Sequence, residues 1–355
     1  MTDSGQDNHK RRPRYSGTHP KKFDQKYKEL QPHKYPDQQT KLRAKGKTPA
    51  GTHVPVLVEE IIACLGPKPG DIVADCTLGY GGHARQFIKH IGETGMLIGF
   101  DMDGTELEKT KARLSNAKAQ LRFYHSNYAG IEKALPGESI PGFDIIFADL
   151  GVSSMQVDNP ARGISYKQDG PLDMRMDSRI RTSGSDLLAT ISEHELSTAL
   201  WELSDEPDHD KIAKFIVSSR SVQPITTVGQ LLRIVLNAKG LTERTWKKQQ
   251  IASPFGSLHP AARTFQAIRI LVNDELNSLK TLLRVAPHCL KPAGRIGIIS
   301  FHSGEDRLVK NSFKELTAQG VYSTCSKNAV TPRTNEIMQN PRSSSAKFRW
   351  AVKAS

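Results

Sequence analysis

The pattern that most constrains the fold is an alternation of short apolar runs and helical patterns that begins at residue 72. Five apolar runs occupy residues 72–77, 96–100, 121–125, 144–148 and 295–301. Helical patterns follow the first run through Ile91 and the second run to about Lys118. Strands that are apolar throughout and alternate with helices are typical of a parallel sheet covered on both faces. The alternation therefore predicts an α/β fold.

The alternation stops between residues 158 and 258. This stretch contains helical patterns, for instance at residues 193–203 and 210–219, joined by polar loops. A loop of that length without structure of its own is uncommon inside a compact domain. We therefore predict a helical domain at residues 158–258, inserted into a sheet domain made of residues 51–157 and 259–355.

Positive charge is concentrated at the two ends of the chain. Of the 355 residues, 50 are Lys or Arg and 37 are Asp or Glu, a net charge of +13. Residues 1–50 carry 13 basic and 5 acidic side chains, and residues 259–355 carry 15 and 6. The first 50 residues have almost no aliphatic side chains, so we predict a basic disordered extension that either tethers RNA or only keeps the chain soluble. The balance indicates a polyanionic partner, a nucleic acid or an anionic membrane surface.

Simple patterns argue against several other classes of protein. No run approaches the roughly 18–20 consecutive apolar residues of a membrane-spanning helix, and the N-terminal stretch lacks the apolar core of a secretory signal. The cysteines, at positions 64, 76, 289 and 325, form no C-x-x-C pair. Such spacing fits neither a disulfide scaffold nor a structural zinc site. We expect a cytoplasmic protein that does not enter a membrane.

A glycine-rich turn lies where the first predicted strand meets the first predicted helix. It covers residues 75–83 and contains the spacing Gly79-x-Gly81-x-x-Ala84. Glycines let the backbone approach a ligand, and a helix N-terminus presents unpaired N–H groups. Asp101 ends the second predicted strand, 22 residues beyond Gly79, where a carboxylate can accept hydrogen bonds from ribose hydroxyls. The turn therefore indicates a cofactor that contains a ribose.

Three interpretations of this turn are open from the spacing alone. It satisfies the fingerprint of a nicotinamide dinucleotide site. It also suits S-adenosylmethionine, which has a ribose but no pyrophosphate, because Asp75 precedes the glycines and can face a sulfonium-bearing amino acid. A structural turn without a ligand is the third interpretation.

Polar residues also follow the fourth and fifth predicted strands. Asp149 ends the fourth strand at the same sheet edge, where it can reach both a cofactor and an entering base. The charged stretch at residues 162–177 either contributes to this site or is a salt-bridged loop that packs the insert against the sheet. His302, Glu305 and Asp306 follow the fifth strand; they suit either a metal site, at a spacing loose for zinc, or the first turn of a helix.

Basic and aromatic residues offer two candidate contacts to RNA. Arg263 and Arg269 lie on neighbouring turns of a predicted helix and either face phosphates or pair with nearby acids. Trp246, flanked by Arg244 and Lys247-Lys248, combines a stacking face with positive charge, which suits unpaired RNA. A buried tryptophan on an insert helix is the alternative.

Six motifs in a fixed order carry a more specific signal. They are HVPVL at residues 53–57, DCTLGYGGH at 75–83, DLGVSSMQ at 149–156, DGPLDMRMD at 169–177, HPAARTFQAIR at 259–269 and FHSGEDR at 301–307. With these motifs, the chain resembles the ribosomal RNA small subunit methyltransferase H family from about residue 52 to the C-terminus. The resemblance implies a Rossmann-like class I S-adenosylmethionine-dependent methyltransferase sheet with a helical inserted domain. It also implies methylation of N4 of a cytidine in the decoding region of 16S rRNA.

Position by position, the resemblance implies which residues bind S-adenosyl-L-methionine. These are Gly81, Gly82, His83, Asp101, Tyr128, Asp149 and Gln156. Tyr128 stands where Phe is common, Ala262 replaces a usual Thr, and Gly304 replaces a usual Leu. The last two departures affect local packing more than chemistry.

Asp149 is also the catalytic candidate, because a carboxylate at a strand end can accept a hydrogen bond from the N–H group of the amine of the target base. This role is a hypothesis, since the Asn/Asp-Pro-Pro-aromatic motif of many amino-methyltransferases is missing. No metal is expected.

Two other classes of function stay open on the sequence alone. A nicotinamide-dependent dehydrogenase is supported by the glycine turn, and a non-enzymatic ribosome-assembly factor by the basic ends. For the methyltransferase, the expected partner is small-subunit ribosomal RNA or the assembled small subunit. The sequence leaves the oligomeric state open, with a homodimer as one option.

Overall fold

The computed structural model describes residues 55–246 and 258–355. The predicted N-terminal extension and Lys247-Lys248 lie outside the described residues. The described chain from residue 55 onward belongs to one compact unit. None of its helices is long and apolar enough to cross a membrane.

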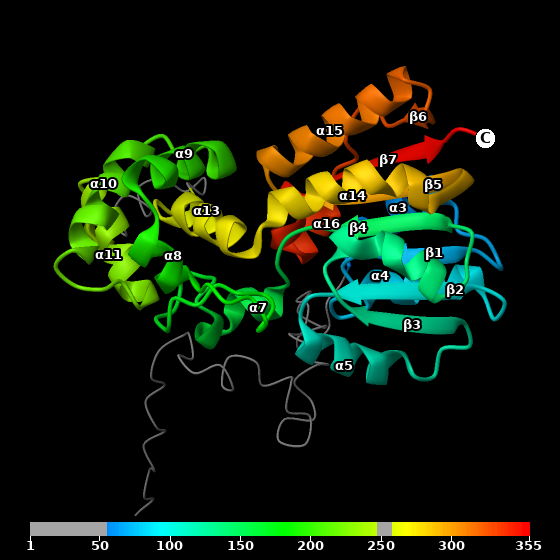
Figure 1. Ribbon diagram of the computed structural model, residues 1–355, viewed down its shortest axis with the longest axis horizontal. Helices are drawn as coiled ribbons and strands as arrows, with labels where there is room; N and C mark the ends of the chain where they lie inside the picture. Colours follow the sequence, from blue (N-terminus) through cyan, green and yellow to red (C-terminus); the bar gives the residue numbers. More distant parts are fainter. Residues whose placement is uncertain (1–54, 247–257) are drawn as a thin grey trace, which may run out of the picture. The chain divides into compact units, whose positions relative to one another are not determined.

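The centre of the fold is a seven-stranded sheet in the order β3-β2-β1-β4-β5-β7-β6, which Figure 1 shows from β3 at one edge to β6 at the other. The strands are β1 (Ile72–Asp75), β2 (Met96–Asp101), β3 (Gln120–His125), β4 (Phe143–Asp149), β5 (Leu290–Ser300), β6 (Tyr322–Cys325) and β7 (Lys347–Lys353). The first five are mutually parallel, and β7 runs antiparallel to both β5 and β6. The predicted α/β class and Rossmann-like sheet are confirmed.

The five predicted strands are parallel as expected, but β6 and β7 at one edge of the sheet were not predicted. β6 has the weakly apolar sequence Tyr-Ser-Thr-Cys, and short strands are common at sheet edges. β7 carries a buried Arg349, which is made tolerable by its pairing with Asp306 on the earlier helix α15 (Ser303–Ala318; Nε to Oδ1, 2.7 Å). A charged residue therefore interrupts the apolar pattern by which a buried strand is recognised.

Helices cover both faces of the sheet because the strands alternate their side chains between two cores. In β4, Ile146 and Ala148 face one core, while Ile145 and Phe147 face the other. The first core contains η2 (Tyr128–Lys133), α6 (Ala134–Gly137), α14 (Glu275–Cys289) and α15 (Ser303–Ala318). The second contains α3 (Val58–Leu65), α4 (Gly82–Ile91) and α5 (Gly104–Leu114).

A third core belongs to helices between β4 and β5, which Figure 1 shows packed together. They are α8 (Gly184–Thr190), α9 (Glu193–Ser204), α10 (His209–Arg220), α11 (Val228–Ala238) and α13 (Ala262–Asn273). The predicted helices at 193–203 and 210–219 are confirmed as α9 and α10. α13 contributes Phe265 and Ile268 to this core, although it lies beyond the predicted end of the insert at residue 258. The division into domains stays a prediction.

Short elements connect these layers. α7 (Ser154–Asp158) and η3 (Pro160–Arg162) follow β4, and α16 (Thr334–Gln339) and η4 (Pro341–Ser345) precede β7. Among these elements, α7 and η3 matter most for the site, because they lead the chain from the carboxyl end of β4 into the helical region.

Candidate active site

Three carboxylates meet at the carboxyl edge of the sheet. Asp75, Asp101 and Asp149 are the last residues of β1, β2 and β4, which are neighbours in the sheet. The strand order reverses between β1 and β4, and ligands of doubly wound sheets bind at such a switch point. The structure thus brings together the acids that the sequence placed at strand ends.

Hydrogen bonds hold the glycine turn against Asp101. Gly79 N donates to Asp101 Oδ2 (2.7 Å), and Asp103 N donates to Asp101 Oδ1 (2.8 Å). The Thr110 hydroxyl donates to the Gly79 carbonyl oxygen (2.5 Å). The acid at the end of β2 and the turn after β1 therefore form one hydrogen-bonded unit.

Gly81 caps the N-terminus of α4 with φ of 79°, a left-handed conformation that favours glycine. A Cβ atom there would lie 2.9 Å from Thr110 Cγ2. Gly82 is the first residue of α4, and a Cβ atom on it would lie 3.2 Å from Pro55. Both predicted glycines thus lie where the backbone has little room for a side chain.

The carboxylates at this edge lose solvation and repel one another. Burial raises the pKa of Asp75 to about 7, that of Asp101 to about 6 and that of Asp149 to about 8. Asp75 and Glu305 add a smaller electrostatic contribution at Asp149. Asp149 Oδ1 is buried without a hydrogen-bond partner. Such a cluster favours a positively charged ligand and disfavours a pyrophosphate beside it.

His83 lies between the turn and Asp149. Its Nε2 is 2.9 Å from the Val56 carbonyl oxygen, so that nitrogen carries the donated proton. Its Nδ1 lies 3.6 Å from Asp149 Oδ2, beyond hydrogen-bonding distance. The ring also packs on Phe147, with centroids 4.7 Å apart. His83 therefore forms one wall beside the Asp149 carboxylate.

The two other predicted cofactor residues are Tyr128 and Gln156. Tyr128 packs against the first core at the start of η2, and burial raises the pKa of its hydroxyl well above the usual range, with smaller contributions from Glu275 and Glu305. Gln156 is on α7, where its Oε1 accepts a hydrogen bond from Ser153 N (2.9 Å) as part of a capping box. The contact found for the Gln156 side chain is therefore a helix cap.

Glu305 adds a further buried carboxylate that acts electrostatically on Asp149. It is buried at the start of α15, where Oε2 accepts from Phe301 N (2.9 Å) and Oε1 lies 3.2 Å from His302 Nε2. Asp306 belongs instead to the ion pair with Arg349. Among the described residues, no cluster of three or more His, Cys, Asp or Glu side chains is arranged to hold a metal ion. The arrangement favours the helix-turn interpretation of this motif.

The two arginines of α13 pair with protein groups. Arg269 donates to both carboxylate oxygens of Glu275, at 2.8 and 3.0 Å. Arg263 Nη1 donates to the Asp205 carbonyl oxygen (2.6 Å). The expected alternative of pairing with a nearby acid is found for Arg269, whereas the contact found for Arg263 is with a backbone carbonyl oxygen.

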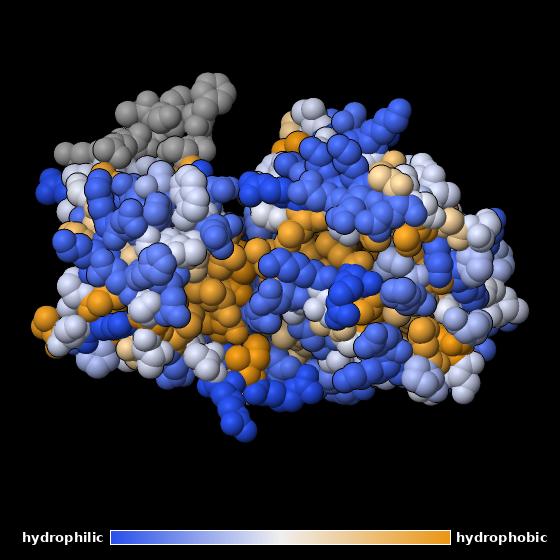
Figure 2. All heavy atoms as spheres, turned by 45° about the horizontal axis from the view of Figure 1, so that its top comes forward, coloured by the Kyte–Doolittle hydropathy of each residue, from blue (hydrophilic) through white to orange (hydrophobic). Residues whose placement is uncertain are grey.

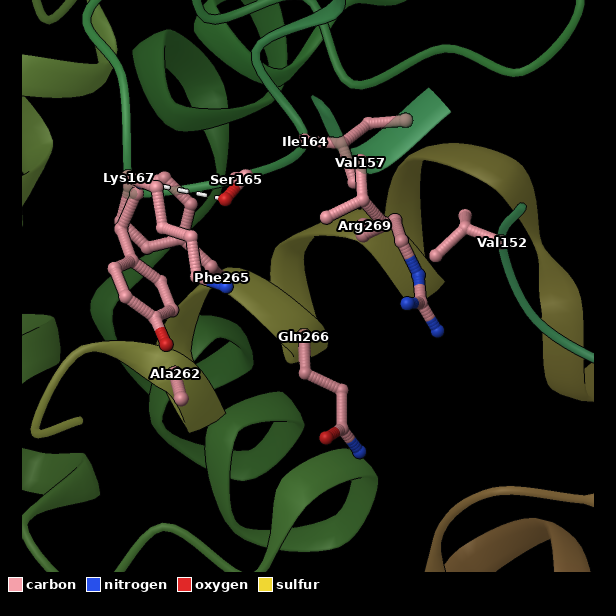
Figure 3. A pocket seen from close by; sticks show the side chains of 10 residues that line it. Val152, Val157, Ile164, Ser165, Lys167, Ala262, Phe265, Gln266 and Arg269 are labelled. Carbon is pink, nitrogen blue, oxygen red and sulfur yellow. Dashed lines mark hydrogen bonds between the residues drawn. The ribbon is translucent and has the colours of Figure 1, made fainter. Parts of the chain in front are cut away.

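A pocket of about 230 Å³ lies between the segment after β4 and α13. Its lining residues are Val152, Val157, Ile164, Ser165, Tyr166, Lys167, Ala262, Phe265, Gln266 and Arg269. Figure 3 shows Gln266 and Arg269 extending from α13 in the same general direction. The surface in Figure 2 likewise has apolar side chains gathered in a hollowed band between polar areas.

Aromatic rings continue from one wall of this pocket. Tyr166 stacks on His259, with centroids 4.2 Å apart and planes inclined by 17°, and also meets the edge of Phe265. Trp246 is half-buried and meets the His259 ring edge-on, with centroids 5.6 Å apart. Trp246 therefore packs beside the pocket wall through His259.

The raised acid pKa values predict how the stability of the cofactor-free protein depends on pH. Asp149 binds its proton more tightly in the folded chain (pKa about 8) than in the unfolded chain (about 3.9), so its contribution is complete below about pH 4 and is lost as pH rises through 8. We expect Asp149→Asn to flatten the fall in unfolding free energy between pH 5 and 8, by at most about 1.4 kcal/mol per pH unit. Urea unfolding at several pH values measures this slope. An unchanged slope would contradict the raised pKa.

Comparison with known proteins gives consistent matches over nearly the whole chain. Residues 50–354 match the MraW methylase family. Ribosomal RNA small subunit methyltransferase H 1 of Lachnoclostridium phytofermentans is 43% identical over 99% of this chain and 95% of its own length. Its namesake from Agathobacter rectalis is 44% identical over 98% of both chains. Ribosomal RNA small subunit methyltransferase H of Clostridioides difficile is 40% identical over 85% of this chain and 98% of its own length. The first two alignments therefore include most of the N-terminal extension.

Proposed function

Because this chain belongs to the MraW methylase family, we infer that it transfers the methyl group of S-adenosyl-L-methionine to ribosomal RNA of the small subunit. The observation that carries this inference is the cluster of Asp75, Asp101 and Asp149 around a glycine turn at the switch point. The chain is an enzyme of the class I methyltransferase fold. A dinucleotide cofactor is disfavoured, because its pyrophosphate would lie beside carboxylates that already repel one another.

The residues of the site fit S-adenosyl-L-methionine. When bound, this cofactor supplies an electrophilic methyl group on a positively charged sulfur. The unpartnered Asp149 Oδ1 and the buried Asp75 would compensate its positive charges. Asp101, held by two backbone N–H groups, has oxygen lone pairs left for the ribose hydroxyls. Gly81, Gly82 and His83 would border the cofactor, with Tyr128 and Gln156 at its periphery.

We further propose that the acceptor is the N4 amine of a cytidine in the decoding region of 16S rRNA. This amine is a poor nucleophile, because its lone pair is delocalised into the ring. Asp149 would accept a hydrogen bond from one of the N–H groups of the amine and hold the nitrogen in line for methyl transfer. The ionised form of Asp149 is the competent acceptor, so activity should rise with pH through the pKa that Asp149 has with cofactor bound.

The pocket between the segment after β4 and α13 suits the target base. Its volume is below the roughly 300–1,000 Å³ of sites for larger ligands, so it matches a single ring system. Val152, three residues beyond Asp149, lines it together with the aromatic Tyr166 and Phe265. An enzyme that modifies a base edge takes an unpaired or flipped-out nucleotide. The helices between β4 and β5 would then form the domain that recognises the RNA.

The decisive experiment compares nucleosides of small-subunit RNA with and without this protein. We expect mass spectrometry to find N4-methylated cytidine only when active enzyme and cofactor are present. Methyl transfer to another nucleoside would reject the proposed base but keep the methyltransferase. RNA binding without transfer would favour an assembly factor, and tight binding of NADH in place of S-adenosylhomocysteine would favour a dehydrogenase.

Deleting residues 1–50 should weaken RNA binding without changing the affinity for the cofactor. The segment has a net charge of +8, and a protein that neutralises fewer phosphates binds RNA with a less steep dependence on salt. We expect a roughly tenfold or greater loss of affinity for a 16S rRNA fragment at low salt, with an unchanged dissociation constant for S-adenosylhomocysteine. Filter binding at several salt concentrations measures both the affinity for RNA and its salt dependence. A deletion variant with the same salt slope would exclude an electrostatic role for the extension.

A further inference from the structure

An arginine from the segment after β4 reaches the loop that carries the ribose acid. Arg162 ends η3, and its Nη2 donates to Asp103 Oδ2. Its Nη1 donates to the backbone carbonyls of Met176 (3.0 Å) and Arg175 (3.3 Å). The guanidinium is one-quarter exposed, and Asp103 is nearly buried. Arg162 is the first residue of the charged stretch at residues 162–177, and the methyl-transfer chemistry described above gives its ion pair with Asp103 no role.

Asp103 connects this arginine directly to Asp101. The backbone N–H of Asp103 donates to Asp101 Oδ1 (2.8 Å), so the two residues share one tight turn. The side chain of Asp103 caps α5, because its Oδ1 accepts from the backbone N–H groups of Thr105 (3.1 Å) and Glu106 (3.2 Å). Its other oxygen faces Arg162. Any movement of Asp103 would therefore displace the carboxylate that we assign to the ribose.

The charges around Asp101 are predominantly negative. Burial is the main cause of its raised pKa, the N–H groups of Asp103 and Gly79 oppose the rise, and the carboxylates of Asp103 and Glu106 add to it. Asp75 lies close enough to interact as well. Glu106 is paired with Arg113 (2.7 Å) and has Lys109 at 3.8 Å. His125, which ends β3 opposite Asp101, lies 4.0 Å from Asp177, and Asp177 pairs with Arg179. Arg162 is the cation found in contact with Asp103.

We propose that Arg162 is a positioning residue for cofactor binding, which neutralises Asp103 and so keeps Asp101 ionised and aligned toward the ribose. The proposal rests on the cofactor site assigned above. Without Arg162, an uncompensated carboxylate would stand next to Asp101 and favour its protonated form. The protonated acid is a poorer acceptor for ribose hydroxyls, so the cofactor would bind less tightly at low pH.

Binding of S-adenosylhomocysteine, measured by titration calorimetry from pH 5 to 9, tests this role. In the wild-type protein, affinity should fall as pH drops through a midpoint near the Asp101 pKa, which is about 6. Arg162→Ala should move this midpoint upward by about one pH unit, which weakens binding about fivefold at pH 6 and about tenfold at pH 5. The loss should shrink above pH 8, and Arg162→Lys should restore most of the affinity.

A second substitution separates the charge effect from a packing effect. Asp103→Asn removes the charge and keeps an N-cap of similar strength. By itself it should lower the midpoint, and in the Arg162→Ala background it should return the midpoint to the wild-type value or below. Arg179→Ala is the matched control, because Arg179 lies just beyond the same charged stretch and pairs with Asp177 rather than Asp103; its midpoint should equal that of the wild type.

Each outcome decides the proposal. An unchanged midpoint in Arg162→Ala, or a shift that Asp103→Asn does not reverse, would reject a charge-based role for Arg162. If Arg162→Ala does not fold, the midpoint of Asp103→Asn alone decides, and a midpoint that stays at the wild-type value would reject the proposal. Failure of the wild-type protein to bind S-adenosylhomocysteine at any pH would instead reject the proposed function.

Discussion

Asparagine in place of Asp149 should lower turnover by about 10²- to 10⁴-fold at saturating cofactor and RNA. The substitution keeps the size of the side chain but exchanges a carboxylate that can accept a proton for an amide that cannot. Asp149 Oδ1 is buried without a hydrogen-bond partner at the end of β4, so this oxygen is available to accept the proton of the amine. Single-turnover transfer of a labelled methyl group measures the chemical step.

Asp144→Asn provides the control for this experiment on the same strand. Asp144 lies near the opposite end of β4, where it accepts from Ile72 N (2.8 Å) and Lys291 Nζ (2.7 Å). Its replacement should cost stability at most and leave the rate of transfer unchanged. If Asp149→Asn turns over at the wild-type rate, Asp149 is not the acceptor of the amine proton.

Alanine in place of Gly81 should weaken binding of S-adenosylhomocysteine by about 10²-fold. The left-handed conformation costs an alanine about 1–2 kcal/mol, and its Cβ would press on Thr110, whose hydroxyl holds the Gly79 carbonyl. Gly79 in turn donates to Asp101, so a shift of the turn moves the ribose acid as well. Displacements of about 1 Å in a catalytic site cost about two orders of magnitude in rate, and we expect a loss of similar size in affinity for the cofactor.

Gly320→Ala separates this effect from backbone strain. Gly320 has a similar φ of 75°, and a Cβ atom there would have no neighbour within 4 Å. Both variants should lose comparable stability in urea unfolding, but only Gly81→Ala should lose affinity for the cofactor. Equal affinity in the two variants would show that the Thr110 contact does not position the site.

The sheet could be predicted from sequence where its strands are apolar on both faces. Runs such as residues 96–100 and 144–148 are buried between two helical layers, so nearly every position is apolar and the strand is unmistakable. β7 could not be predicted in this way, since Arg349 occupies a buried position that only its partner Asp306 makes tolerable. That partner is 43 positions away in the sequence.

The residues of the site likewise fall into those that could be predicted from sequence and those that could not. Asp75, Asp101 and Asp149 could be predicted because each ends a strand, and parallel strands bring their carboxyl ends to one edge. The placement of Glu305 beside them and the pairing of Arg162 with Asp103 depend on how the segments after β4 and β5 fold back. Both contacts join residues that are far apart in the sequence, so the positions of Glu305 and Arg162 could not be predicted from the spacing of residues alone.

The buried carboxylates also bear on how the enzyme releases its product. In the proposed reaction, methyl transfer would leave a neutral thioether in place of the sulfonium, so the acids at the sheet edge would lose a positive neighbour. With pKa values of about 7 and 8, Asp75 and Asp149 would then bind protons near neutral pH, and the amine would supply the proton that Asp149 takes up. The same cluster that attracts the sulfonium would therefore hold the thioether product less tightly, and turnover would couple proton uptake after transfer to proton release when the next cofactor binds.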